Sequence, residues 1–306
     1  MAHTTWHRFR RLLRTAVLAT VLGVVGIIIP NSAVAPVEVT LVKFEHSEGV
    51  ALSENVIWIL AVGSDAREGE EMTHTRGDAL QLVGINTRTG AATSIGIARD
   101  SWVSIPGVGS NRINAALYYG GPQLLGQTVA GLVGIEPDYV MVTRFPFFEA
   151  MINDIGGITV DNPRFFSDTH LKPKGFQAGK IRLNGPTALS FSRIRKSLPG
   201  GDFDRSANQQ LVLAGIQARI AERAREPGFI ERGVLTVLEH MATDVGPGEL
   251  FGIAQAVAQV NPHKITGCVI TGSFANINGA SVVLPSTSQA QAWGDDARDD
   301  AVIENC

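Results

Sequence analysis

The sequence predicts an α/β fold in which a central mixed β-sheet is flanked by helices. Three apolar runs, Val56–Val62, Leu80–Ile85 and Ser94–Ala98, have the length and composition of buried strands. Between the second and third runs, Asn86–Gly90 is polar and ends in glycine, as a hairpin connection does. Later segments with helical periodicity, such as Asp204–Arg225, supply the covering layer.

The remaining elements follow from the same signals. Strands are expected at Val37–Phe44, Trp102–Ile105, Tyr139–Thr143, Ile158–Val160, Val269–Ile270 and Ser281–Leu284. Helices are expected at Gln123–Val133, Phe145–Ile155, 184–192, Asp204–Arg225, Glu231–Met241 and Leu250–Val260. Gly120-Gly121-Pro122 interrupts a helix or loop that begins at Asn114. Phe165–Lys180 and Gly272–Gly279 are expected to be loops.

The chain of 306 residues divides into a short leader and one large domain. We expect a cytoplasmic tail at residues 1–14, a transmembrane anchor at 15–36 and a juxtamembrane spacer at 37–54. Residues 55–225 form the predicted core, and residues 226–306 form a helical and strand extension of the same domain.

The leader combines a basic segment, Arg8–Arg14, with the uncharged apolar run Thr15–Ile29. Basic residues before an apolar run keep the N-terminus in the cytoplasm. The sequence therefore predicts a single-pass protein of the cell membrane whose main domain is extracytoplasmic. A cleaved signal peptide is the alternative, because Ala33-Val34-Ala35 resembles a cleavage site. Pro36 disfavours that cleavage.

Composition excludes some function classes. The chain has 44% hydrophobic and 18% charged residues, which is typical of a globular protein. It holds 26 basic and 29 acidic residues, and 4 of the basic ones lie in the leader, so the rest has 22 against 29, or about −7. That charge is a poor match for a nucleic-acid-binding surface. The sequence contains no GxSxG or HExxH motif.

The only two cysteines of the chain are Cys268 and Cys306, and there is no CxxC motif. Outside the cytoplasm they either form one disulfide that ties down the C-terminus or stay unpaired.

Charged residues gather at the ends of the three apolar runs: Asp65, Arg67, Arg76, Asp78, Arg99 and Asp100. If the three strands pair side by side, these residues converge at one end of the sheet. Carboxylates interleaved with arginines suit a divalent cation together with phosphate. The alternative is a lattice of surface ion pairs, which are common and weak.

A second charged cluster comprises Arg193, Arg195, Asp202, Asp204, Arg205 and Gln209. Arg193 and Arg195 share a face only if the chain is extended between them. Asp204 is a candidate cap for the following helix, whose N-terminus beside Arg205 would attract an anion. A solvated turn with a capping aspartate and scattered cations is the alternative.

Taken together, the motifs resemble those of the LytR-CpsA-Psr family over about residues 55–220. The segments are GSDAR (63–67), TRGDALQLVGIN (75–86), ARDSWVSIPG (98–107), RINAALYYGGP (112–122), IGGITVDNP (155–163), LNGPTALSFSRIRK (183–196) and GDFDRSANQQ (201–210). Three positions depart from the usual pattern, at Gly77, Ala98 and Asp204, and they leave the charged set intact.

The resemblance implies a Mg²⁺-dependent phosphotransferase. By position, Asp65 and Asp78 match residues that help to hold Mg²⁺. The pyrophosphate would be bound by Arg67, Arg76, Arg99, Arg193, Arg195, Arg205 and Gln209. Arg67, Arg99, Arg193, Arg195 and Asp100 are the candidate catalytic residues, and Asp100 and Asp202 are the candidates for the general base.

The implied reaction moves a glycopolymer from a polyprenyl-pyrophosphate carrier to peptidoglycan at the outer face of the membrane. Helices at Phe145–Ile155 and Leu211–Ile220 are candidate walls of an apolar slot for the prenyl chain. The alternatives are a polyprenyl-pyrophosphate hydrolase, a non-catalytic protein that binds the lipid carrier, and a transcription regulator. The acidic main domain and the lack of a helix-turn-helix pattern argue against the regulator. The sequence does not identify the polymer.

Overall fold

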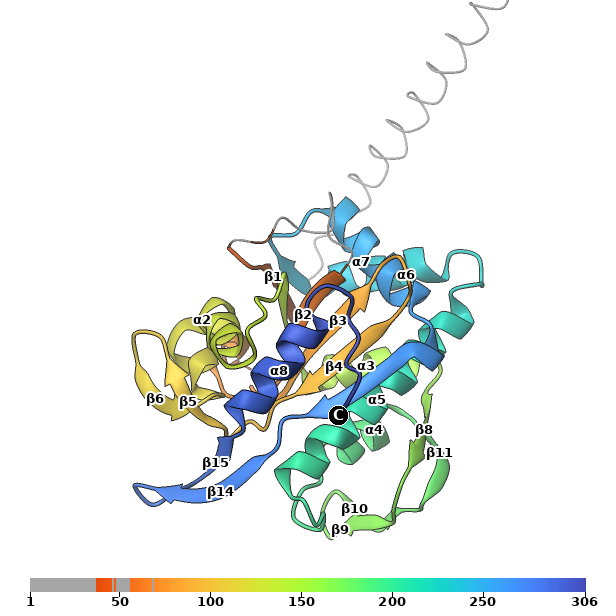
Figure 1. Cartoon of the computed structure of the whole chain (residues 1–306). Helices are drawn as coiled ribbons and strands as arrows, with labels where there is room; N and C mark the ends of the chain where they lie inside the picture. Colours follow the sequence, from red (N-terminus) through yellow and green to blue (C-terminus); the bar gives the residue numbers. More distant parts are fainter. Residues whose placement is uncertain (1–36, 46, 48–55, 68) are drawn as a thin grey trace, which may run out of the picture. The chain divides into compact units, whose positions relative to one another are not determined.

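The computed structural model describes residues 37–45, 47, 56–67 and 69–306 (Figure 1). The predicted tail and anchor at 1–36 lie outside these residues. Within the described residues, no helix is both long enough and apolar enough to cross a membrane. The segment from Val37 to Cys306 forms one compact unit.

A seven-stranded mixed sheet forms the centre of that unit, in the order β12-β1-β7-β2-β3-β4-β13. Its strands are β1 (Val39–Lys43), β2 (Val56–Ser64), β3 (Gly77–Asn86), β4 (Ala92–Gly96), β7 (Tyr139–Arg144), β12 (Met241–Thr243) and β13 (Ile265–Val269). The middle strands β2, β3 and β4 are antiparallel neighbours, whereas β7 and β13 run parallel to β2 and β4 respectively. The expected mixed sheet is therefore confirmed. Residues 39–43, which we assigned to a spacer containing a short strand, pair with β7 and β12 inside this sheet.

The register of β2, β3 and β4 brings their charged ends to one edge. Ser64, at the end of β2, lies opposite Gly77 at the start of β3. Gly96, at the end of β4, lies opposite Gln81 of β3. Because the chain leaves β2, enters β3 and leaves β4 at this edge, the predicted convergence of the first charged cluster is confirmed.

Helices cover both faces of the sheet. They are α2 (Ala115–Val133), α3 (Phe145–Asp154), α4 (Gly185–Arg193), α5 (Asp202–Arg223), α6 (Phe229–Glu239), α7 (Pro247–Gln259) and α8 (Thr287–Ala297). The short 3₁₀ turns are η1 (Met72–His74) and η2 (Pro262–Lys264). Leu60 and Leu82 share a buried cluster with residues of α2 and α8. Ile59 and Ile85 share another with residues of α7, since successive side chains of a strand point to opposite faces.

A further hydrophobic core lies under α3, α4 and α5. It joins Ile152, Phe191 and Val212 to residues of the small strands beside these helices. Those strands are β8 (Ile158–Asn162), β9 (Phe166–Asp168), β10 (Lys172–Phe176) and β11 (Gly179–Leu183). Two more hairpins lie outside the central sheet: β5 (Trp102–Ile105) with β6 (Gly109–Arg112), and β14 (Gly272–Ile277) with β15 (Ala280–Pro285).

Two segments that we expected to be loops contain strands. Phe165–Lys180 holds β9, β10 and the start of β11, and Gly272–Gly279 holds β14. The strands in Phe165–Lys180 were not predicted because the segment contains proline, glycine and exposed lysines. Such short two-stranded ribbons need little alternation of apolar and polar residues. Strand β14 was not predicted because its segment contains glycine and small polar residues. The helix α8 was not predicted at all.

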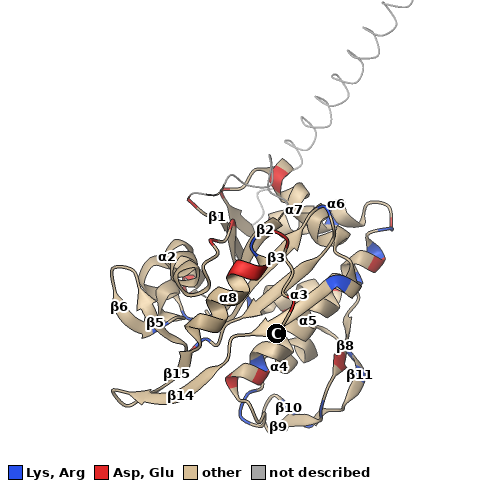
Figure 2. Cartoon of the chain, in the orientation of Figure 1, with Lys and Arg blue, Asp and Glu red and all other residues tan. Residues whose placement is uncertain are grey.

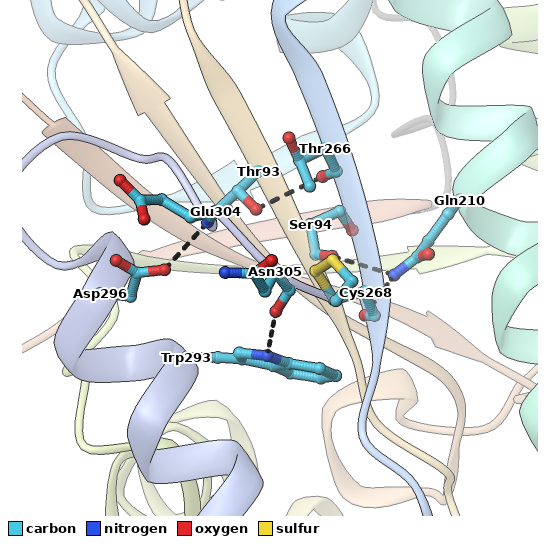
Figure 3. The surroundings of a disulfide bond; sticks show 10 residues. Thr93, Ser94, Gln210, Thr266, Cys268, Trp293, Asp296, Glu304 and Asn305 are labelled. Carbon is cyan, nitrogen blue, oxygen red and sulfur yellow. Dashed lines mark hydrogen bonds between the residues drawn. A yellow bond between two sulfur atoms is a disulfide. The ribbon is translucent and has the colours of Figure 1, made fainter.

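The C-terminal tail is held by a disulfide between Cys268 of β13 and Cys306. Figure 3 shows Trp293 of α8 beside this tail, where its indole Nε1 donates to the Asn305 carbonyl at 2.9 Å. Ala301 and Ile303 are buried. Of the two alternatives for the cysteines, the structure contains the disulfide. The C-terminal tail is packed against the domain.

Candidate functional site

The two charged clusters of the sequence meet beside the charged edge of the sheet. Asp78 begins β3, Arg99 and Asp100 follow β4, and Arg195 follows α4. Asp202 and Arg205 lie in the first turn of α5. Ion pairs connect Arg99 with Asp78, Arg195 with Asp100 and Asp202, and Arg205 with Asp202. We call Arg99, Arg195 and Arg205 the arginine cluster.

Arg99 lies between carboxylates. Its Nη1 donates to Asp78 Oδ1, and its Nε lies 3.9 Å from Asp100 Oδ2. Burial by itself would lower the pKa of Arg99, but Asp78 and Asp100 raise it above the ordinary value. The Nε–H is buried and has no hydrogen-bond acceptor within the described part of the chain. Arg99 is therefore a permanently charged donor with capacity for one more acceptor.

Asp100 links the two clusters. Arg195 Nη1 lies 3.4 Å from Asp100 Oδ2, and Arg112 Nε lies 3.8 Å from Oδ1. The Asp100 side chain is 18% exposed, whereas that of Asp202 is 3% exposed. Asp100 is consequently the more accessible of the two candidate general bases.

Arg205 is the most buried member of the arginine cluster. Its Nη2 lies 2.8 Å from Asp202 Oδ1, yet that contact is an ion pair without hydrogen-bond geometry, since neither Asp202 oxygen has a hydrogen-bond donor among the described residues. Burial lowers the pKa of Arg205; Asp202 opposes this change, and the charges of Arg99 and Arg195 add to it. An anion between the three arginines would relieve that repulsion.

The first turns of α5 are attached to the sheet by polar side chains. Gln81 Nε2 donates to Ser206 Oγ at 2.9 Å and to Gln209 Oε1 at 3.1 Å. Gln210 Nε2 donates to the carbonyls of Ser94 and Cys268 at 3.0 and 2.8 Å (Figure 3). These bonds fix the position of the helix that carries Arg205.

Gly96 permits this close approach of helix and sheet. A Cβ atom at Gly96 would lie 2.4 Å from Ser206 Oγ. The glycine in β4 is therefore required by packing rather than by backbone conformation.

Gln209, the predicted polar contact of the pyrophosphate, is a buried residue of α5. Its Nε2 donates to the Ser192 carbonyl at 3.3 Å, and its Oε1 accepts from Gln81. Because the amide nitrogen carries two hydrogens, one remains for a ligand.

The chain is extended between Arg193 and Arg195, at Ile194, so the condition set by the sequence analysis is met. The structure nevertheless gives the two arginines different neighbours. The Arg193 guanidinium lies over the Phe145 ring, 4.7 Å from its centroid, whereas Arg195 reaches Asp100 and Asp202. Arg193, Arg67 and Arg76 are exposed.

Asp204 is not the helix cap that we expected. The helix α5 begins at Asp202, with Gly201 at the cap position in a conformation with φ of 56°. Asp204 lies in the first turn, where it accepts from the Gly200 amide at 2.9 Å and pairs with Arg164 at 2.9 Å. Its role is to hold the loop before the helix.

The predicted Mg²⁺ ligands fit a divalent cation in one respect that the structure makes visible. Partial desolvation raises the pKa of the exposed Asp65 carboxyl, and repulsion from Asp78 raises it further. A cation between these two carboxylates would remove that repulsion. The described residues contain no group of three or more metal-ligating His, Cys, Asp and Glu side chains. Two carboxylates completed by substrate phosphates are a usual setting for Mg²⁺.

Sequence reasoning missed two arginines. Arg112 of β6 joins Asp100, as described above; it lies in the quoted motif RINAALYYGGP, which was a signal for it. The other is Arg144, at the end of β7, and no motif drew attention to it.

Arg144 is bound to the loop that carries Asp65 and Arg67. Its guanidinium donates to four carbonyl oxygens: those of Ala66 at 3.3 Å, Arg67 at 2.7 Å, Glu70, and Val37 at 3.3 Å. One side chain thus connects the loop after β2 to the start of the described chain.

The apolar slot for the prenyl chain, between the helices at Phe145–Ile155 and Leu211–Ile220, stays a prediction. The helices α3 and α5 share the core that contains Ile152 and Val212, so they lie side by side as expected. A cavity of about 560 Å³ at the end of α3 is lined by Asn153, Gly156, Gly157, Arg182, Leu183, Asn184 and Thr187. None of the predicted site residues lines it.

Comparisons with known proteins agree with the arrangement of the motifs. A model described as the LytR_cpsA_psr family matches residues 30–298. Two relatives are named polyisoprenyl-teichoic acid–peptidoglycan teichoic acid transferase TagU. The one from Enterococcus faecalis is 31% identical over 215 residues, which cover 68% of this chain and 69% of the relative. The one from Bacillus subtilis is 29% identical over 223 residues, which cover 68% and 71%.

Solved structures share the fold. TagV of B. subtilis superimposes with a TM-score of 0.69 at 26% identity, over 82% of this chain and 98% of that one. A TagT structure with bound octaprenyl pyrophosphate lipid gives a TM-score of 0.64 at 22% identity, over 85% and 99%. The second likeness concerns the fold alone.

Proposed function

Because the chain belongs to the LytR-CpsA-Psr family, we propose that it transfers a glycopolymer from a polyprenyl-pyrophosphate carrier to peptidoglycan. The product is a phosphodiester link formed at the outer face of the membrane. The names of the TagU relatives support the type of reaction. The arginine cluster is the observation in this chain that carries the proposal, because three guanidinium groups joined through Asp100 and Asp202 suit a diphosphate.

The reaction has a defined balance. A sugar hydroxyl of peptidoglycan attacks the phosphorus that bears the glycopolymer. One O–P bond forms, the bridging P–O bond of the pyrophosphate breaks, and its electron pair leaves with polyprenyl phosphate. The hydroxyl proton passes to a carboxylate, for which Asp100 is the accessible candidate.

In this proposal, the arginines neutralise the charge of the diphosphate during the reaction. The diphosphate repels an incoming nucleophile, and its leaving phosphate gains charge as the bond breaks. Arg99 and Arg195 already carry positive charge at the site where this negative charge develops. Their present partners Asp78, Asp100 and Asp202 occupy the position of counterions, which the substrate phosphates would replace.

We propose Mg²⁺ as the cofactor, held by Asp65 and Asp78. The ion would neutralise phosphate charge when bound. The exposed Arg67, Arg76 and Arg193 are proposed to bind the same pyrophosphate. Gln209 would also bind the pyrophosphate, through the side-chain N–H that does not donate to the Ser192 carbonyl.

We also propose that residues 15–36 anchor the protein in the membrane with the N-terminus in the cytoplasm. The carrier is a lipid, so an anchored catalytic domain would work at the surface that presents its substrate. The basic residues before the apolar run support this orientation.

A release assay tests the function. The full chain in detergent is supplied with a polyprenyl-pyrophosphate-linked sugar and peptidoglycan, with and without Mg²⁺, and polyprenyl phosphate and labelled peptidoglycan are measured. Mg²⁺-dependent formation of both products is expected. Lipid release without labelled peptidoglycan would indicate a hydrolase, and tight lipid binding without turnover would indicate a carrier-binding protein.

A further inference from the structure

The hairpin β14–β15 differs in chemistry from the site that it borders. Residues 265–294 contain no Asp, Glu, Lys, Arg or His. Figure 2 shows the hairpin entirely in the colour of uncharged residues, extended from the body of the protein. A charged ligand would find no opposite charge on this hairpin.

The hairpin is attached to Asp100, Ser101 and Arg112, which lie beside the arginine cluster. The Val283 amide donates to the Asp100 carbonyl at 3.0 Å, and Ser101 forms a parallel bridge with Val283. Arg112 Nη2 donates to the Ser281 carbonyl at 3.0 Å. Since the side chain of Asp100 pairs with Arg195, strand β15 borders the proposed phosphate site between Ser281 and Val283.

An exposed aromatic side chain lies on one face of the hairpin. Phe274 is 61% exposed. Its ring centroid is 5.4 Å from that of Phe203, which follows the buried Asp202. A Cβ atom at Gly201 would lie 3.8 Å from the Phe274 ring. The face that bears Phe274 is therefore turned toward the start of α5.

The same face carries hydrogen-bonding groups. Phe274 is paired with Val283 and Asn276 with Ser281, and residues two apart in a strand point the same way. Leu284 lies on the opposite face, paired with Ser273. One face thus combines an open aromatic ring with an amide and a hydroxyl, and it has no charge.

This combination suits a carbohydrate. The C–H face of a sugar ring packs on an aromatic ring, while its hydroxyls bond to amides and hydroxyls. A prenyl chain would favour a continuous aliphatic surface, and an anionic headgroup would favour lysine or arginine. The hairpin offers neither on the face of Phe274.

We propose that the Phe274 face of the β14–β15 hairpin is the acceptor subsite, which binds the glycan strand of peptidoglycan beside the arginine cluster. This inference rests on the proposed function. Attachment at Asp100 places the bound sugar next to the accessible carboxylate, so that a hydroxyl of the strand can reach the phosphorus.

Glycan binding tests the subsite without turnover. The probe is N-acetylchitotetraose, an uncharged analogue of the strand, titrated into the full chain in detergent by calorimetry. Phe274→Ala should weaken its affinity about tenfold, the usual effect of removing an aromatic anchor. Phe274→Tyr should keep it. Leu284→Ala is the matched control, because it removes an exposed apolar side chain from the other face, and it should change nothing.

Kinetics distinguish the acceptor side from the donor side. In Phe274→Ala, the KM for peptidoglycan should rise about tenfold while the KM for the lipid-linked donor stays constant. Equal glycan affinity of the wild type and Phe274→Ala, or no binding by the wild type, would overturn the subsite. A raised donor KM, or reduced binding to lipid vesicles, would assign the hairpin to the carrier or the membrane instead.

The two proposals fail differently. Glycan binding that depends on Phe274, without any transfer to peptidoglycan, would overturn the proposed transferase and support the subsite. Transfer that proceeds normally in Phe274→Ala at low peptidoglycan concentration would support the transferase and overturn the subsite.

Discussion

Asp202 and Arg205 form an ion pair within the first turn of α5, with 3% and 8% of their side chains exposed. Two charges at this depth are stable only because each compensates the other. Removing either charge alone would leave the other buried without its partner, at a cost in free energy. The ion pair therefore holds Arg205 in place, although α5 begins in a glycine-rich loop. Arg205 is therefore held in position by the fold itself, through its ion pair with Asp202.

A double-mutant cycle measures that dependence. Asp202→Asn leaves the buried guanidinium without its partner and should cost about 3–5 kcal/mol in the free energy of unfolding. Combining it with Arg205→Met should cost less than the sum of the single changes. Urea denaturation of the four proteins gives the coupling energy. Additive losses would mean that the two charges do not depend on each other.

Arg99→Ala should lower turnover about 10²-fold or more, the usual loss for one preorganised donor. Its guanidinium both pairs with Asp78 and has an unused N–H, so alanine removes charge and geometry together. Arg232→Ala, an exposed arginine of α6, is the control and should retain full activity. A wild-type rate in the Arg99 variant would rule out the assignment of the site.

Asp65→Ala should raise the Mg²⁺ concentration needed for half-maximal activity by about tenfold or more. The side chain is exposed, so its loss should leave the melting temperature unchanged. The exposed Glu239 of α6 supplies a control, Glu239→Ala. Chelator should abolish wild-type turnover and Mg²⁺ should restore it. Unfolding of the Asp65 variant would point to a structural role.

The strands that position the site could be predicted because most of their side chains are apolar. Val56–Val62 and Leu80–Ile85 each lie in a strand of the observed sheet, and the hairpin at Asn86–Gly90 fixes their order with β4. The charged residues at the strand ends then had to meet. Periodicity and turn chemistry were sufficient for this part of the site.

Elements with weak apolar signals could not be predicted. In α8 the buried positions are Ala290, Trp293, Gly294 and Ala297, so small residues replace the broad stripe that marks most helices. The distinct neighbours of Arg193 and Arg195 were also out of reach. They depend on Phe145 and Asp100, which are distant in sequence, and only tertiary packing decides between such partners.

The disulfide supports the docking of α5. Cys268 accepts a hydrogen bond from Gln210 through its carbonyl, and its bond to Cys306 closes a segment with a sequence separation of 38. Reduction should lower the free energy of unfolding by about 2–4 kcal/mol and the melting temperature measurably. In Cys306→Ser, reductant should have no effect. An unchanged wild-type melting temperature would show that the bond contributes nothing.

Arg144 is the residue whose role the sequence did not indicate, and its variant separates positioning from folding. Arg144→Ala removes the donors to the carbonyls of Ala66, Arg67 and Glu70. The loop that bears Asp65 should then move relative to the arginine cluster. Because small misplacements in an active site are costly, turnover should fall about 10- to 100-fold.

Arg144→Lys should not restore the rate, since an ammonium group is a point donor and cannot span several carbonyls as a guanidinium does. Arg182→Ala is the matched control: this arginine also donates to a carbonyl, that of Gly156 at 2.8 Å, but in a different part of the fold. Hydrogen exchange decides the cause. Faster exchange confined to residues 65–70 is expected, whereas faster exchange throughout the sheet would reveal a loss of global stability.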